Sequence, residues 1–266
     1  MKINEFYQPI TLDDAYEKLV ENSNNQVMGG GAWMKLSGAN IDTLIQLGNL
    51  GLGNISETQD KLIFGAMVSL HQIEANKTVG SIYNGMLKKA INCVMGIQVR
   101  NVATIGGTVM GRYPFSDILT ALLTMKTKLV FYKRKEIMLE DYLLEKKPER
   151  DLLLFVEIEK GEARGYFKKV GKTALDFAIV NVAVANENGK LSISVGARPG
   201  LARLCHQTMD YINQNELSDE IMQSAALKVL EELDFSSNSK AGKDYRMELA
   251  KVYVLRGLRA VTCHED

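Results

Sequence analysis

Cysteine and histidine are scarce in this chain, which has three of each among its 266 residues. The cysteines Cys93, Cys205 and Cys263 are widely separated, and no two histidines stand at a metal-binding spacing. Because a structural zinc site or an iron–sulfur cluster takes about four ligands, usually in close pairs, we expect neither in this chain. Scattered, unpaired cysteines also favour a reducing cytoplasm over an oxidising compartment.

An excess of either charge is lacking too, as are long apolar runs. The 32 Lys and Arg residues balance the 32 Asp and Glu residues, whereas binding to nucleic acid or to an anionic membrane favours a basic excess. The first residues form no apolar signal segment, and no apolar run reaches the roughly 20 residues of a membrane helix. We therefore expect a cytoplasmic protein that binds neither nucleic acid nor membrane.

The first 160 residues carry mixed signals for helices and strands. Thr11 and Asp14 form a capping box that predicts a helix reaching about residue 22. The charged connector over residues 146–150 is expected to lie in solvent. Apolar patterns predict strands at 26–28, 43–47, 129–132 and 152–159, and helices over 79–94 and directly after Ser116-Asp117.

Beyond about residue 160 the pattern changes to three strands followed by two helices. The strands are expected at residues 164–170, 177–186 and 190–197, and Asn188-Gly189 predicts a hairpin between the last two. Ser218 is a good N-cap for the first closing helix. We therefore expect an α+β fold with one domain boundary near residue 160 and a further one near residue 53.

Consecutive glycines follow apolar residues at two places, VMGGGAW (27–33) and ATIGGTV (103–109). Glycine lets successive backbone N–H groups point to one side and lets a phosphate approach closely. Two such loops, brought together after β-rich segments, could hold the two phosphates of a dinucleotide. A glycine pair is more often a turn, a bulge or a close approach of backbone, and neither segment is a GxGxxG fingerprint or a P-loop. From the residues alone, both interpretations stay open.

Four segments in order carry a resemblance to a known family. They are VMGGGAWMKL, IQVRNVATIGGTVM with YPFSDILTALLTM, GYFKKVGKTALDFAIVNVAVA, and DYRMELAKVYVLRGL. Together they resemble the FAD-binding medium subunits of molybdenum hydroxylases, the flavoproteins of xanthine dehydrogenase and carbon monoxide dehydrogenase. The resemblance implies an α+β fold with a two-subdomain, PCMH-type FAD-binding domain over 1–160 (subdomains 1–53 and 54–160). A small C-terminal domain of three antiparallel strands and helices would follow over 161–266.

The resemblance also implies which residues contact FAD. Residues 28–33 would hold the pyrophosphate from one side and residues 104–108 from the other, through backbone N–H groups and two threonine hydroxyls. Asp117 would accept a hydrogen bond from a ribityl or ribose hydroxyl, Leu153 would pack on the isoalloxazine ring, and Lys168 would lie near the flavin. The full set is Met28, Gly29, Gly30, Gly31, Ala32, Trp33, Thr104, Ile105, Gly106, Gly107, Thr108, Asp117, Leu153 and Lys168.

Three of these side chains also have a structural interpretation. Asp117 could cap the helix that it precedes, Leu153 could be plain strand core, and Lys168 could be a solvated strand lysine. The sequence also departs from the family in both glycine segments. Thr108 replaces the usual Asn, while Gly31 and Ala32 replace the usual Thr or His and Ser or Asp. Backbone donors would have to replace the side-chain donors that are lost.

By resemblance, the chain is expected to be an electron-transfer subunit. Its FAD would take electrons from a [2Fe–2S] small subunit and pass them to NAD or another acceptor, while a molybdopterin-binding large subunit holds the substrate. No catalytic side chain is expected, because the redox chemistry belongs to the flavin. Two alternatives stay open. One is a stand-alone FAD-dependent oxidase, and the other is a non-enzymatic scaffold that has lost the flavin.

Overall fold

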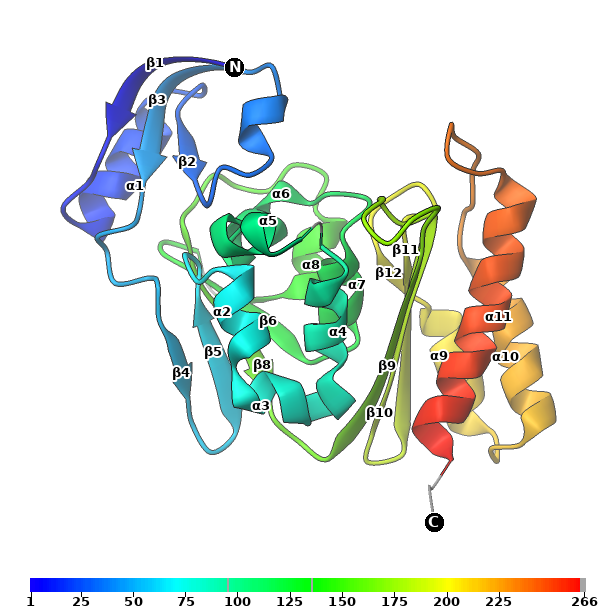
Figure 1. The fold of residues 1–266 in the computed structure, drawn as a ribbon. Helices are drawn as coiled ribbons and strands as arrows, with labels where there is room; N and C mark the ends of the chain where they lie inside the picture. Colours follow the sequence, from blue (N-terminus) through cyan, green and yellow to red (C-terminus); the bar gives the residue numbers. More distant parts are fainter. Residues whose placement is uncertain (95, 135, 264–266) are drawn as a thin grey trace. The chain divides into compact units, whose positions relative to one another are not determined.

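The computed structural model describes residues 1–94, 96–134 and 136–263. The chain divides into two compact units, each assembled from separate stretches of sequence (Figure 1). Unit 1 comprises residues 1–73, 97–111 and 127–159, and unit 2 comprises residues 74–96, 112–126 and 160–266. Helix and strand both contribute to each unit, which confirms the predicted α+β class.

The first part of unit 1 is a three-stranded parallel sheet in the order β1-β3-β2, covered on one face by helix α1. Helix α1 begins after Thr11, whose hydroxyl oxygen accepts the N–H of Asp14 at 3.1 Å, as the capping box predicts. Ala15 and Leu19 of this helix are buried against Ile45 of the sheet. The elements are β1 Lys2–Tyr7, α1 Leu12–Glu21, β2 Gln26–Met28, the 3-10 turn η1 Met34–Leu36 and β3 Asn40–Gln46.

The second part of unit 1 is an antiparallel sheet in the order β4-β5-β8-β6-β7. Helix α6 packs on β5 and β8, whose inward side chains, among them Leu62, Phe64 and Val156, are fully buried. The strands are β4 Ile55–Glu57, β5 Lys61–Gly65, β6 Thr127–Phe131, β7 Ile137–Met138 and β8 Leu153–Glu159. The helices are α2 Leu70–Ala75, α5 Gly96–Val102, α6 Ile105–Gly111 and α8 Leu139–Leu144.

Unit 2 is built on an antiparallel sheet in the order β12-β11-β10-β9. Helices α10 and α11 cover one face, and α4 and α7 pack against the other (Figure 1). The strands are β9 Ala163–Val170, β10 Val180–Glu187, β11 Lys190–Gly196 and β12 Arg203–Leu204. The helices are α3 Lys77–Ser81, the 3-10 turn η2 Ile82–Gly85, α4 Met86–Asn92, α7 Asp117–Leu123, α9 His206–Gln214, α10 Asp219–Glu232 and α11 Lys243–Thr262.

Two expectations about local structure were wrong, and one helix was missed. The segment around residues 103–109 is not β-rich, because helix α6 begins at Ile105 directly after helix α5. The single helix expected over 79–94 is broken at residues 83–85, where Tyr83, Asn84 and Gly85 all have left-handed backbone with φ of 48°, 52° and 67°. Helix α9 lies in a stretch for which no element was expected.

The interleaving of the two units has a simple cause. Helices α4 and α7 come from the first 126 residues, but their apolar side chains pack on the sheet that residues 163–204 build. The pattern of the sequence changes near residue 160, but helices α4 and α7, which precede that point, belong to the same compact unit as the sheet that follows it. The division into domains 1–160 and 161–266 therefore stays a prediction.

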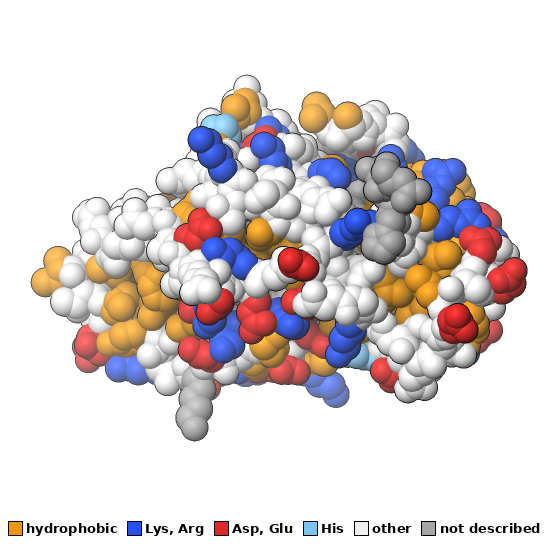
Figure 2. All heavy atoms as spheres, turned by 90° about the horizontal axis from the view of Figure 1, so that it is seen from below, with side chains coloured by type: hydrophobic (Ala, Val, Ile, Leu, Met, Phe, Trp, Pro, Cys, Tyr) orange, Lys and Arg blue, Asp and Glu red, His pale blue; other side chains and the backbone are white. Residues whose placement is uncertain are grey.

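The described surface carries both charges, and the helices and titratable side chains can be checked for membrane spans and metal sites. Figure 2 shows acidic and basic side chains intermixed over the face that it presents, as the balanced composition leads one to expect. Within the described ranges, no helix combines the length and the apolar character needed to cross a lipid bilayer. Among the same residues, no three side chains of His, Cys, Asp or Glu gather where they could hold a metal ion.

Candidate functional site

The two glycine segments meet within unit 1. A side-chain carbon built on Gly29 would lie only 2.7 Å from Thr104 Oγ1 and 3.2 Å from the Cα of Gly107. One built on Gly30 would lie 1.4 Å from the carbonyl oxygen of Val102. Such distances leave no room for any residue but glycine. Of the structural roles that the sequence leaves open for the glycines, close approach of backbone to backbone is the one observed.

The first glycine segment is a half-buried loop between β2 and η1. Gly31 has a φ of +69°, the left-handed backbone that glycine adopts without strain. Within the described part of the chain, the N–H groups of residues 29–32 donate to no acceptor. Half-buried donors without a partner in the protein are available to an anion, and successive amides in such a loop commonly bind one.

The second glycine segment is the first turn of helix α6, and its N–H groups are already used. Thr104 acts as the cap of this turn, and residues 66–68, directly after β5, supply the remaining acceptors. The N–H groups of Ile105, Gly106, Gly107 and Thr108 donate in turn to Val68 O at 3.0 Å, Ala66 O at 2.9 Å, Thr104 Oγ1 at 3.1 Å and Thr104 O at 3.0 Å.

Side chains of the second segment add few donors. The Thr108 hydroxyl donates to the carbonyl oxygen of Thr104 at 3.0 Å, and Thr104 itself is only 5% exposed. Gly106 is a packing residue, because a side-chain carbon there would lie 2.6 Å from Ala66 O. Gly107 alone is exposed. Residues 104–108 therefore line the first loop and offer it few hydrogen-bond donors. The N–H groups and the Thr108 hydroxyl that the sequence predicted as donors to a ligand donate to acceptors within the chain.

Leu153, predicted to touch the isoalloxazine ring, is the first residue of β8 and is 4% exposed. It pairs with Phe131 of β6 in the middle of the second sheet of unit 1. This position is that of an ordinary core leucine. Its predicted contact with a flavin stays a prediction.

Asp117 is the first residue of α7, in unit 2, while Ser116 is the cap. The carboxylate is buried, and Asp117 Oδ1 accepts a hydrogen bond from Asn181 Nδ2 at 2.7 Å. Its Oδ2 lies 3.8 Å from Lys169 Nζ. Burial raises the pKa of Asp117 to about 6, although the hydrogen bond from Asn181 and the charge of Lys169 both favour the ionised form.

Lys168 and its neighbour Lys169 lie on opposite faces of β9, as the two-residue period of a strand requires. Lys168 is exposed, and its ammonium lies 5.7 Å from the ring centroid of Tyr253 on α11. Lys169 is the lysine beside Asp117, and its ammonium donates to Cys93 O at 2.9 Å. The two-residue period of a strand would have shown from the sequence that the two lysines lie on opposite faces. Asn181 is a polar residue within an apolar strand, and this signal could have identified it.

A cofactor with a pyrophosphate fits the first glycine loop. The loop offers successive unpaired N–H groups on backbone that only glycine can place against α5 and α6. The nearby exposed Gly107 has no side chain to obstruct a ligand. These residues therefore fit the diphosphate of a dinucleotide, which backbone donors can bind without a lysine or arginine.

Comparison with known proteins agrees with this chemistry. Residues 1–158 match the family described as the FAD binding domain in molybdopterin dehydrogenase. Residues 165–261 match the family described as the CO dehydrogenase flavoprotein C-terminal domain. The glyceraldehyde dehydrogenase medium chain of Sulfolobus acidocaldarius is 24% identical over 94% of this chain and 95% of its own length. Aldehyde oxidase 1 of Bos taurus is 26% identical over 88% of this chain, which spans only 20% of that relative.

Solved structures share the fold at low identity. The carbon monoxide dehydrogenase from Hydrogenophaga pseudoflava has a TM-score of 0.89 at 19% identity, covering 98% of this chain and 97% of that one. Quinoline 2-oxidoreductase from Pseudomonas putida 86 has a TM-score of 0.85 at 20% identity, with the same coverage. At these identities the likeness concerns the fold.

The matched family is one of FAD-binding domains, which defines a flavoprotein, and FAD is its cofactor. The chain belongs to the family of FAD-binding medium subunits of molybdenum hydroxylases. It is accordingly an oxidoreductase subunit, which confirms the resemblance drawn from the four sequence segments. A scaffold without flavin does not agree with this membership.

Proposed function

We propose that residues 28–33 bind the pyrophosphate of FAD, chiefly through the backbone N–H groups of residues 29–32. The observation that carries the proposal is that these four groups have no partner within the described part of the chain. Residues 104–108 form the opposite wall, against which the loop is packed. On this account Gly31 and Ala32 replace the family's side-chain donors with backbone ones.

The roles proposed for the other predicted residues differ in support. Leu153 lies in the same unit as the loop and stays a candidate for contact with the flavin ring. Asp117 has both carboxylate oxygens engaged by Asn181 and Lys169, which favours a structural role over a ribose contact. Lys168 is exposed on the α11 face of β9, beside the ring of Tyr253.

We further propose that the chain works in a complex with a molybdopterin-binding large subunit and a [2Fe–2S] small subunit. When bound, FAD supplies the redox chemistry, taking electrons from the [2Fe–2S] subunit and giving them to NAD or another acceptor. The side chains of this chain bind and orient it. The name of the Sulfolobus relative, a medium chain of a dehydrogenase, supports a multi-subunit arrangement. The free cysteines Cys93, Cys205 and Cys263 support a cytoplasmic location.

Titration with three flavins tests the binding proposal. The flavin-free chain should bind FAD at least about a hundredfold more tightly than FMN or riboflavin, because only FAD carries the pyrophosphate; a hundredfold is about 2.7 kcal/mol. Equal affinities for FAD and FMN would contradict a pyrophosphate site. Anaerobic addition of NADH to the FAD-loaded chain then tests the acceptor. Bleaching of the flavin absorbance supports NAD, and no bleaching assigns the role to another acceptor.

The stand-alone oxidase is separated from the subunit by turnover. Such an oxidase would consume a substrate and oxygen without partners and would need a catalytic base of its own. The subunit should show no turnover alone. Its flavin should become reducible by substrate only when the two partner subunits are added.

A further inference from the structure

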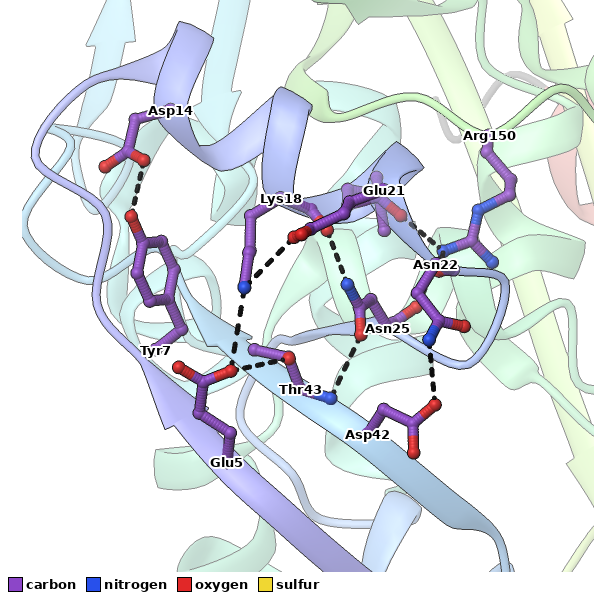
Figure 3. Close-up of polar contacts among 11 residues, drawn as sticks. Glu5, Tyr7, Asp14, Lys18, Glu21, Asn22, Asn25, Asp42, Thr43 and Arg150 are labelled. Carbon is purple, nitrogen blue, oxygen red and sulfur yellow. Dashed lines mark hydrogen bonds and ion pairs between the residues drawn. The ribbon is translucent and has the colours of Figure 1, made fainter.

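Arg150 reaches from the connector before β8 into the turn that precedes the first glycine loop (Figure 3). The connector is largely exposed as expected, Arg150 included. Within the described residues, the hydrogen bonds of this side chain all go to backbone. Its guanidinium donates hydrogen bonds to carbonyl oxygens at the end of α1 and in the turn that follows. These acceptors are Leu19 O at 2.7 Å, Asn22 O at 3.2 Å, Ser23 O at 2.8 Å and Asn25 O at 2.7 Å.

The carbonyls at the end of a helix have no partner within it, so this turn depends on outside donors. A planar guanidinium carries five N–H donors in a fixed fork, whereas an ammonium carries three on a single nitrogen, so the guanidinium can serve more carbonyls at once. Asn25 completes the turn, with its Nδ2 donating to Lys18 O at 2.7 Å and its Oδ1 accepting the N–H of Thr43 at 3.1 Å (Figure 3). Strand β2 starts at the next residue and ends at Met28, where the glycine loop begins.

The neighbouring Asp151 is tied to the other sheet of unit 1. Its buried carboxylate accepts the N–H of Lys133 at 3.0 Å and that of Arg134 at 2.8 Å, both directly after β6. The next residue, Leu152, is buried in the core with residues of α1. Two adjacent residues therefore join the sheet that ends in the glycine loop to the sheet on which α6 packs.

We infer that Arg150 is a positioning residue for FAD, which fixes the 22–25 turn and β2 and thereby holds the first glycine loop in place against α6. The inference rests on the proposed function, because it assigns the pyrophosphate to that loop. A donor set held in place before binding gains affinity, since the ligand does not have to order it. Without the guanidinium, the carbonyls of Leu19, Ser23 and Asn25 lose this donor, and the loop loses its anchor. The carbonyl of Asn22 keeps the N–H of Asn25.

Hydrogen exchange of the flavin-free full chain tests the clamp without reference to any ligand. In Arg150→Met, amides over residues 22–28 should exchange at least about tenfold faster than in the unaltered chain, because local opening becomes easier. Exchange in unit 2 should not change. The matched control is Lys147→Met, which removes an exposed cation from the same connector and should leave all rates as they were.

Flavin titration tests the positioning role. In Arg150→Met the affinity for FAD should fall about tenfold or more, equivalent to about 1.4 kcal/mol, while the weak affinity for FMN stays the same. The FAD affinity of Arg150→Lys should lie between those of the unaltered chain and Arg150→Met, since an ammonium donates to fewer carbonyls. A residue that merely supports the fold would lower both affinities together, so the ratio of FAD to FMN affinity is the decisive quantity.

Several outcomes would overturn the inference. These are exchange that rises equally in both units, an unchanged ratio of affinities, or an equal effect of Lys147→Met. Faster exchange with unaltered FAD affinity would also overturn it, because the turn would then be ordered without positioning the loop. Failure of the unaltered chain to bind FAD would instead refute the proposed function, and the exchange result would still decide the clamp.

Discussion

The two glycine segments look alike in sequence and differ in structure. Residues 29–32 form a loop whose N–H groups donate to no acceptor among the described residues, whereas the N–H groups of residues 105–108 all donate within the chain. In the first segment, glycine leaves backbone N–H groups without a partner among those residues. In the second segment, glycine lets helix α6 begin in contact with residues 66–68, directly after β5. Consecutive glycines therefore indicate where two stretches of backbone approach each other closely. Which of their N–H groups lack an acceptor within the protein decides where a ligand can bind.

Asp117 belongs with the second segment in this comparison. Its oxygens face Asn181 and Lys169, so its polar groups are engaged before any ligand arrives. The contrast between engaged and free groups therefore separates the residues that the family resemblance grouped together. Each of the following changes tests that separation.

The largest effect is expected for Gly30→Ala. The added carbon would lie 1.4 Å from Val102 O, a backbone atom that can move only if the loop leaves α5. We expect the chain to lose about 3 kcal/mol or more of unfolding free energy, at the top of the range for overpacking, and to lose FAD binding. Urea denaturation and FAD titration measure the two effects. A variant that binds FAD normally would show that the loop need not touch α5.

Two variants in α6, Gly106→Ala and Gly107→Ala, are expected to differ by about 2 kcal/mol in unfolding free energy. In Gly106→Ala the added carbon would lie 2.6 Å from Ala66 O, so a loss of about 2 kcal/mol of stability is expected. In Gly107→Ala, at an exposed helix position, it would lie 3.1 Å from the Thr104 hydroxyl and at an ordinary contact distance of 3.9 Å from Gly29 Cα. Alanine favours a helix by about 0.5–1 kcal/mol, so stability and FAD affinity should stay near their original values. A large loss of FAD affinity in Gly107→Ala alone would mean that this wall binds the ligand directly.

Asp117→Asn should change how stability depends on pH. Because the pKa of Asp117 is raised from 3.8 to about 6 on folding, the folded chain holds its proton more tightly than the unfolded chain. The contribution of Asp117 to stability is therefore full below pH 3.8 and declines as pH rises to about 6. Relative to Asp117→Asn, the original chain should lose about 2–3 kcal/mol between pH 4 and pH 7, since each pKa unit is worth about 1.4 kcal/mol and the unfolded carboxyl is already partly ionised at pH 4.

Urea denaturation of both proteins at four pH values checks this prediction, and flavin-free chains are used for it. A stability difference that stays constant with pH would mean that Asp117 is not buried beside its partners. FAD affinity at pH 7 should change little in the variant if the carboxylate is engaged as described. A loss of affinity without a change in the pH profile would place Asp117 on the ribose instead.

A smaller loss is expected for Gly31→Ala. The position has space, the nearest atom being Met28 Sδ at 3.4 Å, but its φ of +69° strains a residue with a side chain. The cost is about 1 kcal/mol, so FAD affinity should fall by less than about tenfold. The backbone N–H remains in the variant, which is why the loss is modest. A complete loss of binding would indicate that the side chain itself occupies the place of the ligand.

Much of the fold could be predicted because its signals are local. The cap at Thr11, the cap at Ser218 and the Asn188-Gly189 turn each depend on a few neighbouring residues, and each is present in the structure. The break at Tyr83–Gly85 could not be predicted, because Gly165 of β9 approaches Tyr83 so closely that a side-chain carbon would lie 2.4 Å from its carbonyl oxygen. That constraint comes from a strand 80 residues further along the chain.

The site was predicted less completely than the fold, for the same reason. The family resemblance identified the two glycine segments, but it could not say which N–H groups other parts of the chain would occupy. Arg150 gave no signal, because an arginine in a charged connector is ordinarily solvated. Its partners are carbonyls of residues 19–25, which the sequence does not connect to it in any way.

Hydrogen exchange at single-residue resolution, with and without FAD, tests the central claim most directly. We expect the amides of residues 29–32 to exchange rapidly in the flavin-free chain and to become strongly protected when FAD binds. The amides of residues 105–108 should be protected already and change little. Protection that appears on FAD binding at residues 105–108, with residues 29–32 still exchanging rapidly, would contradict the account.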